Sequence, residues 1–266
     1  MSRSSPPPPG VLDAFGLRGD PVPLPGGSGP VWRVGGVVLK PGTDPAHQRW
    51  LGEVLATVEQ RGFRLAEVRP TPDGAWVVDG WGAQSVLAGV PAHEGPPDWS
   101  AVVAASRDLH RASRHLERPA LLDARTDAWA VADRAAWGEA DPAVPAVARP
   151  LVTLLRAVPA PPGPAQVVHG DLTRNVLVEA GMPPGVIDVS PYWRPASWAE
   201  GIVVADALAW HHAAPSLLDA LGVPAQAVAR GLLFRLFTSC LLHDADDPRL
   251  RAEVDGARRV AAVLGL

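Results

Sequence analysis

The sequence predicts an α+β fold of two lobes, a small β-rich N-terminal lobe and a larger, mostly helical C-terminal lobe. Three observations support this prediction. Short β-branched runs dominate the first part of the chain, apolar residues recur at helical spacing over most of the remainder, and one strand-like hairpin interrupts the helical part. A chain of 266 residues can bury a substantial core in such an arrangement.

Proline and glycine clusters divide the chain into segments. We expect a Pro-rich lead-in over residues 1–19, an N-terminal lobe over 20–81 and a C-terminal lobe over 82–266. The stretch SSPPPPG within the lead-in is typical of a disordered or polyproline-like entry.

The N-terminal lobe should contain a hairpin, one helix and two further strands. VWRV and VVL, with a Gly-Gly pair between them, predict the hairpin. A helix is expected to begin after the N-cap Asp44, with Pro45 at its first position, and to stop at Gly62. FRLAEVRP and AWVVDGW then predict two strands joined by the turn TPDG.

The C-terminal lobe is predicted to be helical except around the hairpin. SAVVAASRDLHRAS, VPAVARPLVTLLRAV and most segments after residue 199 have helical periodicity. Between them, NVLV and GVIDV flank the turn AGMPPG, which predicts a β-hairpin with polar residues at its ends.

Composition and charge exclude several classes of partner. Hydrophobic residues make up 47% of the chain and charged residues 20%, as in ordinary globular proteins. The net charge of −4 argues against a nucleic-acid surface and suits a polycationic small substrate slightly better. The start lacks the apolar core of a secretory signal, and no stretch approaches 18 uninterrupted apolar residues. We therefore expect a cytoplasmic protein without a membrane span.

Polar side chains gather at the ends of the predicted hairpin. His169, Asp171 and Asn175 lie in the loop before its first strand, and Asp188 ends its second strand. A hairpin returns its second strand beside its first, so Asp188 should approach this loop. One asparagine and two aspartates, without cysteine, suit a hard cation such as Mg²⁺. A carboxylate not needed by the metal could position or deprotonate a hydroxyl.

Lys40 is the only lysine of a chain whose lysines and arginines total 24, and it ends an apolar run. A compact ammonium on a flexible stem can reach phosphate oxygens from a strand end, where a bulkier planar guanidinium substitutes poorly. The alternative is that Lys40 only ends an edge strand, where lysine is common.

The order of these features resembles the aminoglycoside phosphotransferase and choline kinase superfamily, which has the protein-kinase-like fold. The shared order is a Gly-rich loop, a lysine after a strand, a glutamate on the next helix, His-x-Asp, an asparagine, and an aspartate after a hairpin. The resemblance covers roughly residues 20–262. It implies transfer of a phosphoryl group from ATP or GTP, with Mg²⁺, to a hydroxyl of a small-molecule acceptor.

The resemblance also implies roles for individual residues. Asp171 would be the catalytic aspartate, Asn175 and Asp188 the metal ligands, and His169 and Asp206 structural supports of the loop. Glu53 would pair with Lys40, although a helical glutamate is more often a solvated residue. The nucleotide-binding set would comprise Gly26, Gly27, Ser28 and Gly29 of the Gly-rich loop, Lys40, Glu53, and Asp79 and Trp81 of an adenine-binding hinge over 79–83.

The sequence departs from the family pattern between Asp171 and Asn175, where the spacing is four residues instead of five. Removing one residue displaces an extended chain by about 3.3–3.8 Å, far more than Mg²⁺ coordination tolerates. The loop must take another path, or Asn175 does not bind the metal. Arg174 could supply a catalytic positive charge in this loop.

A second departure is the aromatic stretch after Asp188. Tyr192, Trp193, Arg194 and Glu200 could form a substrate wall, or this loop could simply pack on the helical lobe. The shortened catalytic loop also leaves open a pseudokinase, which binds nucleotide or ligand without turnover, and an interaction scaffold that keeps only the fold. The sequence identifies neither the acceptor nor the oligomeric state.

Overall fold

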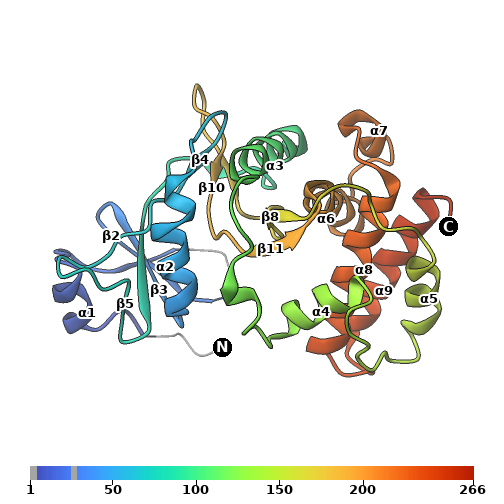
Figure 1. The fold of residues 1–266 in the computed structure, drawn as a ribbon, viewed down its shortest axis with the longest axis horizontal. Coiled ribbons are helices and arrows are strands. Elements are labelled where there is room, and N and C mark those ends of the chain that lie inside the picture. Colours follow the sequence, from blue (N-terminus) through green and yellow to red (C-terminus); the bar gives the residue numbers. More distant parts are fainter. Residues whose placement is uncertain (1–4, 25–28) are drawn as a thin grey trace.

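The computed structural model describes residues 5–24 and 29–266 and has two lobes (Figure 1). In the N-terminal lobe lie α1 (Pro9–Ala14), β1 (Val22–Leu24), β2 (Val31–Val34), β3 (Val37–Pro41), α2 (Pro45–Glu53), the 3₁₀ turn η1 (Leu55–Thr57), β4 (Arg64–Leu65), β5 (Val77–Val78) and β6 (Trp81–Ser85).

The chain then continues through β7 (Val90–Pro91), α3 (Trp99–Ser113), the 3₁₀ turn η2 (Ala120–Leu122), α4 (Ala128–Ala136), α5 (Arg149–Arg156), β8 (Gln166–His169), β9 (Val176–Val178), β10 (Gly185–Val186), β11 (Pro191–Arg194), α6 (Ala196–Trp210), α7 (Leu217–Leu221), α8 (Ala225–Leu242) and α9 (Pro248–Val263). This α+β, bilobal, kinase-like arrangement confirms the predicted fold class.

The N-terminal lobe is built on an antiparallel sheet in the order β1-β2-β3-β6-β5. Its small core includes Leu39 and Trp81, and α1 adds the fully buried Val11 to it. The prediction of a disordered entry is therefore wrong for the last residues of SSPPPPG. Proline suits the first turn of a helix, where its missing N–H has no partner to lose, and the apolar residues that follow bury this helix on the sheet.

Helix α2 is shorter than predicted. It ends at Glu53, and the 3₁₀ turn η1 follows. The Thr57 hydroxyl donates to the Val54 carbonyl at 2.7 Å, a local bond that competes with helix continuation. Gly52 is required beneath Trp76, because a Cβ at this position would lie 2.3 Å from the indole ring.

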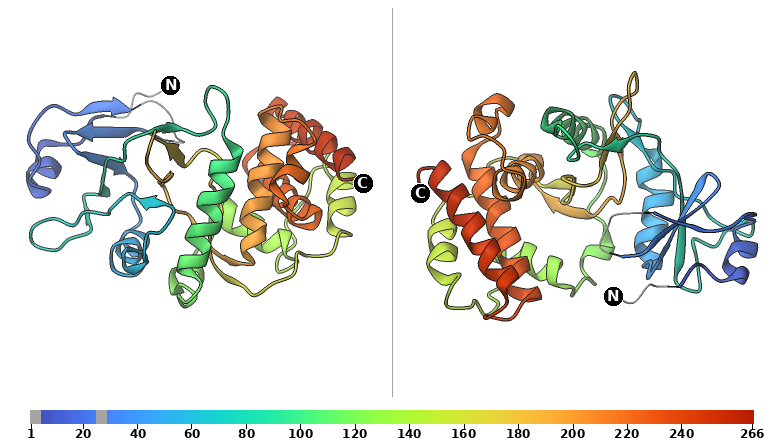
Figure 2. Two further views of the ribbon diagram at one scale, coloured as in Figure 1. Left: turned by 90° about the horizontal axis from the view of Figure 1, so that it is seen from above. Right: turned by 180° about the vertical axis from the view of Figure 1, so that it is seen from behind.

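A second, four-stranded sheet joins the lobes. Its order is β4-β10-β9-β7, so that β4 of the N-terminal lobe pairs with β10 of the predicted hairpin. Figure 2 shows this sheet beside α3, between the antiparallel sheet and the helices of the C-terminal lobe. The β9–β10 hairpin is thus anchored to both lobes.

The C-terminal core centres on the crossing of α6 and α8. Twelve residues of α6 are buried. The two helices approach at Gly201 and Gly231, since a Cβ on Gly201 would lie 2.1 Å from the Ala227 carbonyl oxygen. By length and composition α8 could cross a membrane, but 67% of it is buried in this core, as is usual for a central helix of a globular lobe.

Candidate active site

Lys40 lies near the end of β3 and reaches toward the C-terminal lobe. Its ammonium forms an ion pair with the carboxylate of Asp188, and the two side chains are 24% and 43% exposed. Burial lowers the pKa of Lys40 to about 8, so that the ammonium stays mostly protonated at neutral pH. Opposite charges from the two lobes therefore meet at one partly exposed point.

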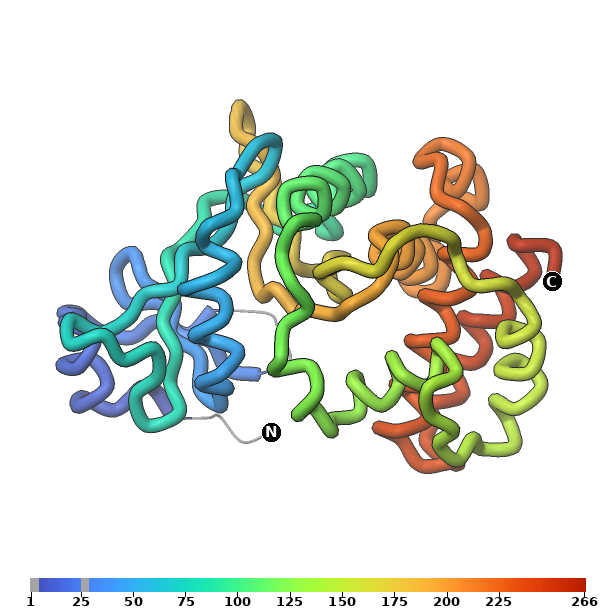
Figure 3. The backbone as a smooth tube through the Cα atoms, in the orientation of Figure 1, coloured from blue at the N-terminus to red at the C-terminus, as the bar shows by residue number. Residues whose placement is uncertain are grey.

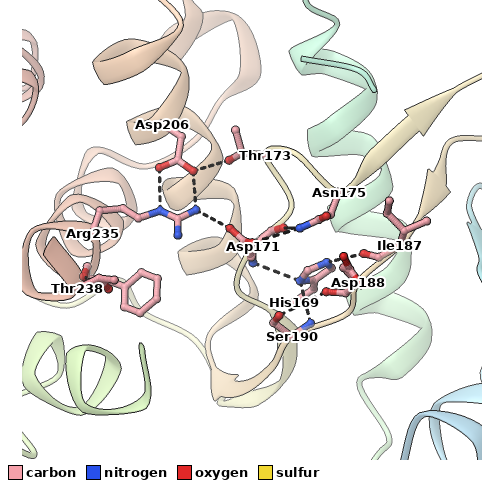
Figure 4. Close-up of polar contacts among 11 residues, drawn as sticks. His169, Asp171, Thr173, Asn175, Ile187, Asp188, Ser190, Asp206, Arg235 and Thr238 are labelled. Atoms are coloured by element: carbon pink, nitrogen blue, oxygen red, sulfur yellow. Dashed lines mark hydrogen bonds and ion pairs between the residues drawn. The ribbon is translucent and has the colours of Figure 1, made fainter. Parts of the chain in front are cut away.

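The hairpin places Asn175 next to this ion pair. Val176 is paired with Val186, and the Ile187 N–H donates to the Asn175 carbonyl at 3.0 Å. Asp188 follows with a φ of 52°, in the left-handed region that non-glycine residues seldom adopt. The chain bends there, at the open end of the hairpin (Figure 4).

His169 holds the loop together from its centre (Figure 4). Its Nδ1 accepts hydrogen bonds from the backbone N–H groups of Asp171, at 3.2 Å, and Ser190, at 3.3 Å. The proton of the neutral ring must then be on Nε2, which donates to the Ile187 carbonyl at 3.2 Å. Burial lowers the pKa of His169 to about 4, consistent with a neutral ring that positions backbone.

The four-residue spacing is accommodated by a tight turn. The Asn175 N–H donates to the Leu172 carbonyl at 3.0 Å, which folds the asparagine back toward Asp171. Its Nδ2 donates to the backbone carbonyl of Asp171 at 2.7 Å and to the Asp171 carboxylate at 3.2 Å. The amide nitrogen is occupied by these contacts, which turns the amide oxygen away from Asp171.

A buried arginine that the sequence analysis missed completes the loop. Arg235 of α8 donates to Asp171 at 2.7 Å and to both carboxylate oxygens of Asp206, at 3.0 and 2.7 Å (Figure 4). Asp206 also accepts from the Thr173 hydroxyl at 2.5 Å. Burial would raise the pKa of Asp171, but the charge of Arg235 outweighs it and holds this pKa below its usual range.

No family model and no curated protein matches the sequence. Solved structures do. Spectinomycin phosphotransferase in complex with ADP and spectinomycin superposes with a TM-score of 0.60, at 12% identity over 96% of this chain and 97% of that one. A choline/ethanolamine kinase family protein from Mesorhizobium loti gives a TM-score of 0.54, at 20% identity over 94% and 90% of the two chains. The GDP complex of aminoglycoside 2'-phosphotransferase-IIIa gives 0.53, at 13% identity over 96% of each chain.

The chain has the aminoglycoside phosphotransferase and choline kinase fold. The predicted resemblance is thereby confirmed at the level of the fold.

Within this phosphotransferase fold, the predicted ion pair between Lys40 and Glu53 is wrong. Glu53 instead accepts a hydrogen bond from Trp76 Nε1 at 3.1 Å, while Lys40 pairs with Asp188. On α2 it is His47 that lies toward the site, with its Nε2 2.9 Å from the Val189 carbonyl oxygen. Six residues of helix separate His47 from Glu53, which turns their side chains about 120° apart.

The predicted hinge over residues 79–83 is also wrong. Asp79 and Gly80 form the turn between β5 and β6, with φ values of 49° and 77°. An Asp-Gly pair between apolar residues is a strong hairpin signal, because both positions need positive φ. The Trp81 ring is buried in the N-terminal core, and the connection to the C-terminal lobe begins only after Ser85.

Two further expectations concern loops. Gly26, Gly27 and Ser28 lie outside the described residues; of the Gly-rich loop, Gly29 is described. The exposed Arg174 sits in the turn before Asn175, near enough for its charge to lower the pKa values of His93 and His211, secondary to burial.

The stretch after Asp188 is not the loop that the sequence predicted. Residues 191–194 form β11, which pairs with β8. The ring of Tyr192 packs against Trp198 and Phe234. Glu200 is buried and accepts two hydrogen bonds from Arg107, at 3.0 and 2.8 Å, so its proposed place in a substrate wall is wrong. Tyr192, Trp193 and Arg194 do line a cavity of about 410 Å³.

Proposed function

We propose that this protein transfers a phosphoryl group from ATP or GTP, with Mg²⁺, to a hydroxyl of a small molecule. The observation that carries the proposal is the ion pair between Lys40 and Asp188 beside the loop of Asp171 and Asn175. A bound nucleotide would separate the two charges, with Lys40 on phosphate oxygens and Asp188 on the metal.

The residues at this point fit Mg²⁺. The amide nitrogen of Asn175 is held by Asp171, which leaves its oxygen for a cation beside the Asp188 carboxylate. The described residues contain no group of three or more His, Cys, Asp or Glu side chains that could hold a metal. Mg²⁺ commonly takes one or two protein ligands and completes its coordination with phosphates and water. When bound, it would neutralise charge on the phosphates.

Asp171 is suited to orient the acceptor. Arg235 and Asn175 hold its carboxylate, and 44% of the side chain remains exposed. Its lowered pKa keeps it ionised at neutral pH, so it can accept a hydrogen bond from the attacking hydroxyl. Positioning in line with the leaving group would then supply most of the rate enhancement.

The related folds support nucleotide donors of both kinds. The spectinomycin phosphotransferase structure contains ADP and spectinomycin, the aminoglycoside 2'-phosphotransferase structure contains GDP, and amicoumacin kinase, which has the same fold, contains AMP-PNP. We therefore keep both ATP and GTP as donors, and a small molecule as acceptor.

The alternative is a nucleotide- or ligand-binding protein without turnover. It is favoured by the same contact that orders the loop, because Arg235 neutralises the carboxylate of Asp171. A carboxylate with lowered basicity is a weaker general base. The two functions share the nucleotide site and differ only in transfer.

The nucleotide site can be tested by thermal unfolding. We expect Mg-ATP or Mg-GTP at 100 times its Kd to raise the free energy of unfolding by about 2.7 kcal/mol. Lys40→Met should remove most of this gain, because it deletes the ammonium that pairs with Asp188 at the site. Arg49→Met, at an exposed position of α2, is the matched control and should keep the gain. A wild-type protein that does not respond to millimolar nucleotide would exclude the proposed function.

The metal site can be tested through the Mg²⁺ dependence of nucleotide affinity. The hairpin register brings Asn175 beside Asp188, so Asp188→Asn and Asn175→Ala should both weaken nucleotide binding with Mg²⁺ and have little effect in EDTA. Titration calorimetry at varied Mg²⁺ measures this. A loss confined to Asp188→Asn would mean that Asn175 does not bind the metal.

A further inference from the structure

The C-terminal lobe contains a cavity beside β11 that is not lined by the residues of the proposed nucleotide site. It has a volume of about 410 Å³, within the range of small-molecule sites. One wall is β11, and the other is the segment between α3 and α5, which Figure 3 shows in green between the lobes. Its lining includes the charged residues Arg118, Asp123, Arg125, Asp133, Arg134, Glu139 and Arg194.

The cavity adjoins the loop that carries Asp171. Gly170, directly before Asp171, packs so closely on Tyr192 of the cavity wall that a Cβ would lie 2.5 Å from the ring. Arg125, on the opposite wall, donates to the Pro191 carbonyl at 3.2 Å. Burial is the main cause of the lowered pKa of His47, and the charges of Arg125 and Lys40 lower it further. Arg125 of the cavity wall and Lys40 thus both lie near His47.

Every carboxylate that lines the cavity is already paired with an arginine. Asp123 accepts from Arg118 at 2.7 Å. Asp133 and Glu139 both accept from Arg194, at 2.9 and 2.6 Å, and Arg194 makes four hydrogen bonds to them in total. An ammonium group entering the cavity would find these carboxylates occupied and would face the arginines as well.

One arginine of the cavity, Arg134, is not paired with a carboxylate of the described part of the chain. Arg125 binds Asp127 through two hydrogen bonds of 3.0 Å. Arg134 donates only to the backbone carbonyl of Arg125, at 3.2 Å, and has no ion-pair partner among the residues that the structure describes. A half-buried guanidinium with donors to spare favours a carboxylate or phosphate, which it can bind through two parallel hydrogen bonds.

We propose that this cavity binds the acceptor, and that the acceptor is a hydroxyl compound carrying an anionic carboxylate or phosphate group held by Arg134. This inference rests on the proposed function. In the transfer, the acceptor oxygen bonds to the γ-phosphorus as the bond to the β,γ-bridging oxygen breaks. The nucleoside diphosphate leaves, and the hydroxyl proton passes to Asp171 and then to water. The guanidinium of Arg134, unpaired among the described residues, thus favours an anionic acceptor over the polycationic substrate that the net charge of the chain suggested.

Binding is tested without nucleotide, by titration calorimetry with four probes. D-Glucuronate and glucose 6-phosphate carry the two anionic groups, D-glucose is their neutral counterpart, and kanamycin is the polycation. We expect saturable binding of at least one anionic probe, at least tenfold tighter than that of glucose or kanamycin. Arg134→Gln should weaken it tenfold or more. Arg114→Gln, an exposed arginine at the end of α3 and outside the cavity lining, should leave it unchanged.

Two results would overturn the inference: equal or tighter binding of glucose or kanamycin, or no saturable binding of either anionic probe. Retention of anion affinity in Arg134→Gln would also overturn it, provided that circular dichroism shows a folded variant. These outcomes are separate from the proposed function, which is judged by Mg-nucleotide binding. Anion binding without nucleotide binding would leave the anion site at Arg134 standing and would remove the kinase activity and the acceptor role.

Discussion

Asp171→Asn should reduce phosphoryl transfer by about 10²–10⁴-fold, the contribution expected of general-base assistance. Nucleotide affinity should stay within about twofold, because Asp171 contacts Arg235 and Asn175, whereas the proposed phosphate and metal contacts are made by Lys40 and Asp188. Arg235 keeps its bonds to Asp206 in this variant, so the loop should remain folded. Nucleotide consumption with an accepted substrate measures the first effect, and calorimetry with nucleotide measures the second.

The control for this prediction is Asp73→Asn, at an exposed aspartate in the turn before β5. It should leave both transfer and nucleotide affinity unchanged. An acceptor whose turnover survives Asp171→Asn would remove Asp171 from the mechanism. A protein that binds nucleotide and the anionic probes but transfers nothing would instead be the binding protein without turnover.

Arg235→Leu should lower the free energy of unfolding by about 3–5 kcal/mol. The substitution leaves the carboxylate of Asp206, which is 1% exposed, without the cation that compensates it. Leucine fits the apolar surroundings of α8. Its helix propensity is close to that of arginine, so a change in propensity contributes little to the loss. For a chain of this size the midpoint of thermal unfolding should fall by roughly 10 °C. Denaturant and thermal melts measure both quantities.

Two variants test whether the loss of stability in Arg235→Leu comes from the buried charge of Asp206 or from the removal of any arginine. Arg258→Leu deletes an exposed partner of Asp255 on α9 and should leave the midpoint within experimental error. Adding Asp206→Asn to Arg235→Leu removes the uncompensated charge, so the double variant should be more stable than Arg235→Leu alone. If Arg235→Leu were no less stable than Arg258→Leu, the ion-pair network would not hold the loop.

Arg235 connects these two predictions. The same guanidinium orders the shortened loop and lowers the basicity of the Asp171 carboxylate, the proposed catalytic group. The loop is thus stabilised by a contact that also weakens Asp171 as a base. Arg235→Lys should retain the charge but lose the fork that binds Asp171 and Asp206 together.

The lobes, the hairpin and the central residues of the site could be predicted from the sequence. A change of apolar period from two to 3.6 residues marks the boundary between a strand-rich and a helical part. A hairpin returns its second strand beside its first, so Asn175 and Asp188 had to lie close together whatever the rest of the fold. The Asp-Gly pair before Trp81 also predicts a turn, because both positions need positive φ, and this signal outweighs the expectation of a strand and hinge there.

The partners of the charged side chains were decided by the tertiary structure alone. Glu53 and His47 share one helix, and only the packing of α2 turns His47 toward Val189 and Glu53 toward Trp76. An arginine in the apolar run of α8 indicates a buried partner, but the sequence does not say which carboxylate it meets. That pairing depends on the close crossing of α6 and α8 at Gly201 and Gly231, which brings Arg235 onto Asp206. Local patterns encode backbone angles and periodicity, whereas contacts between distant segments arise only when whole elements pack.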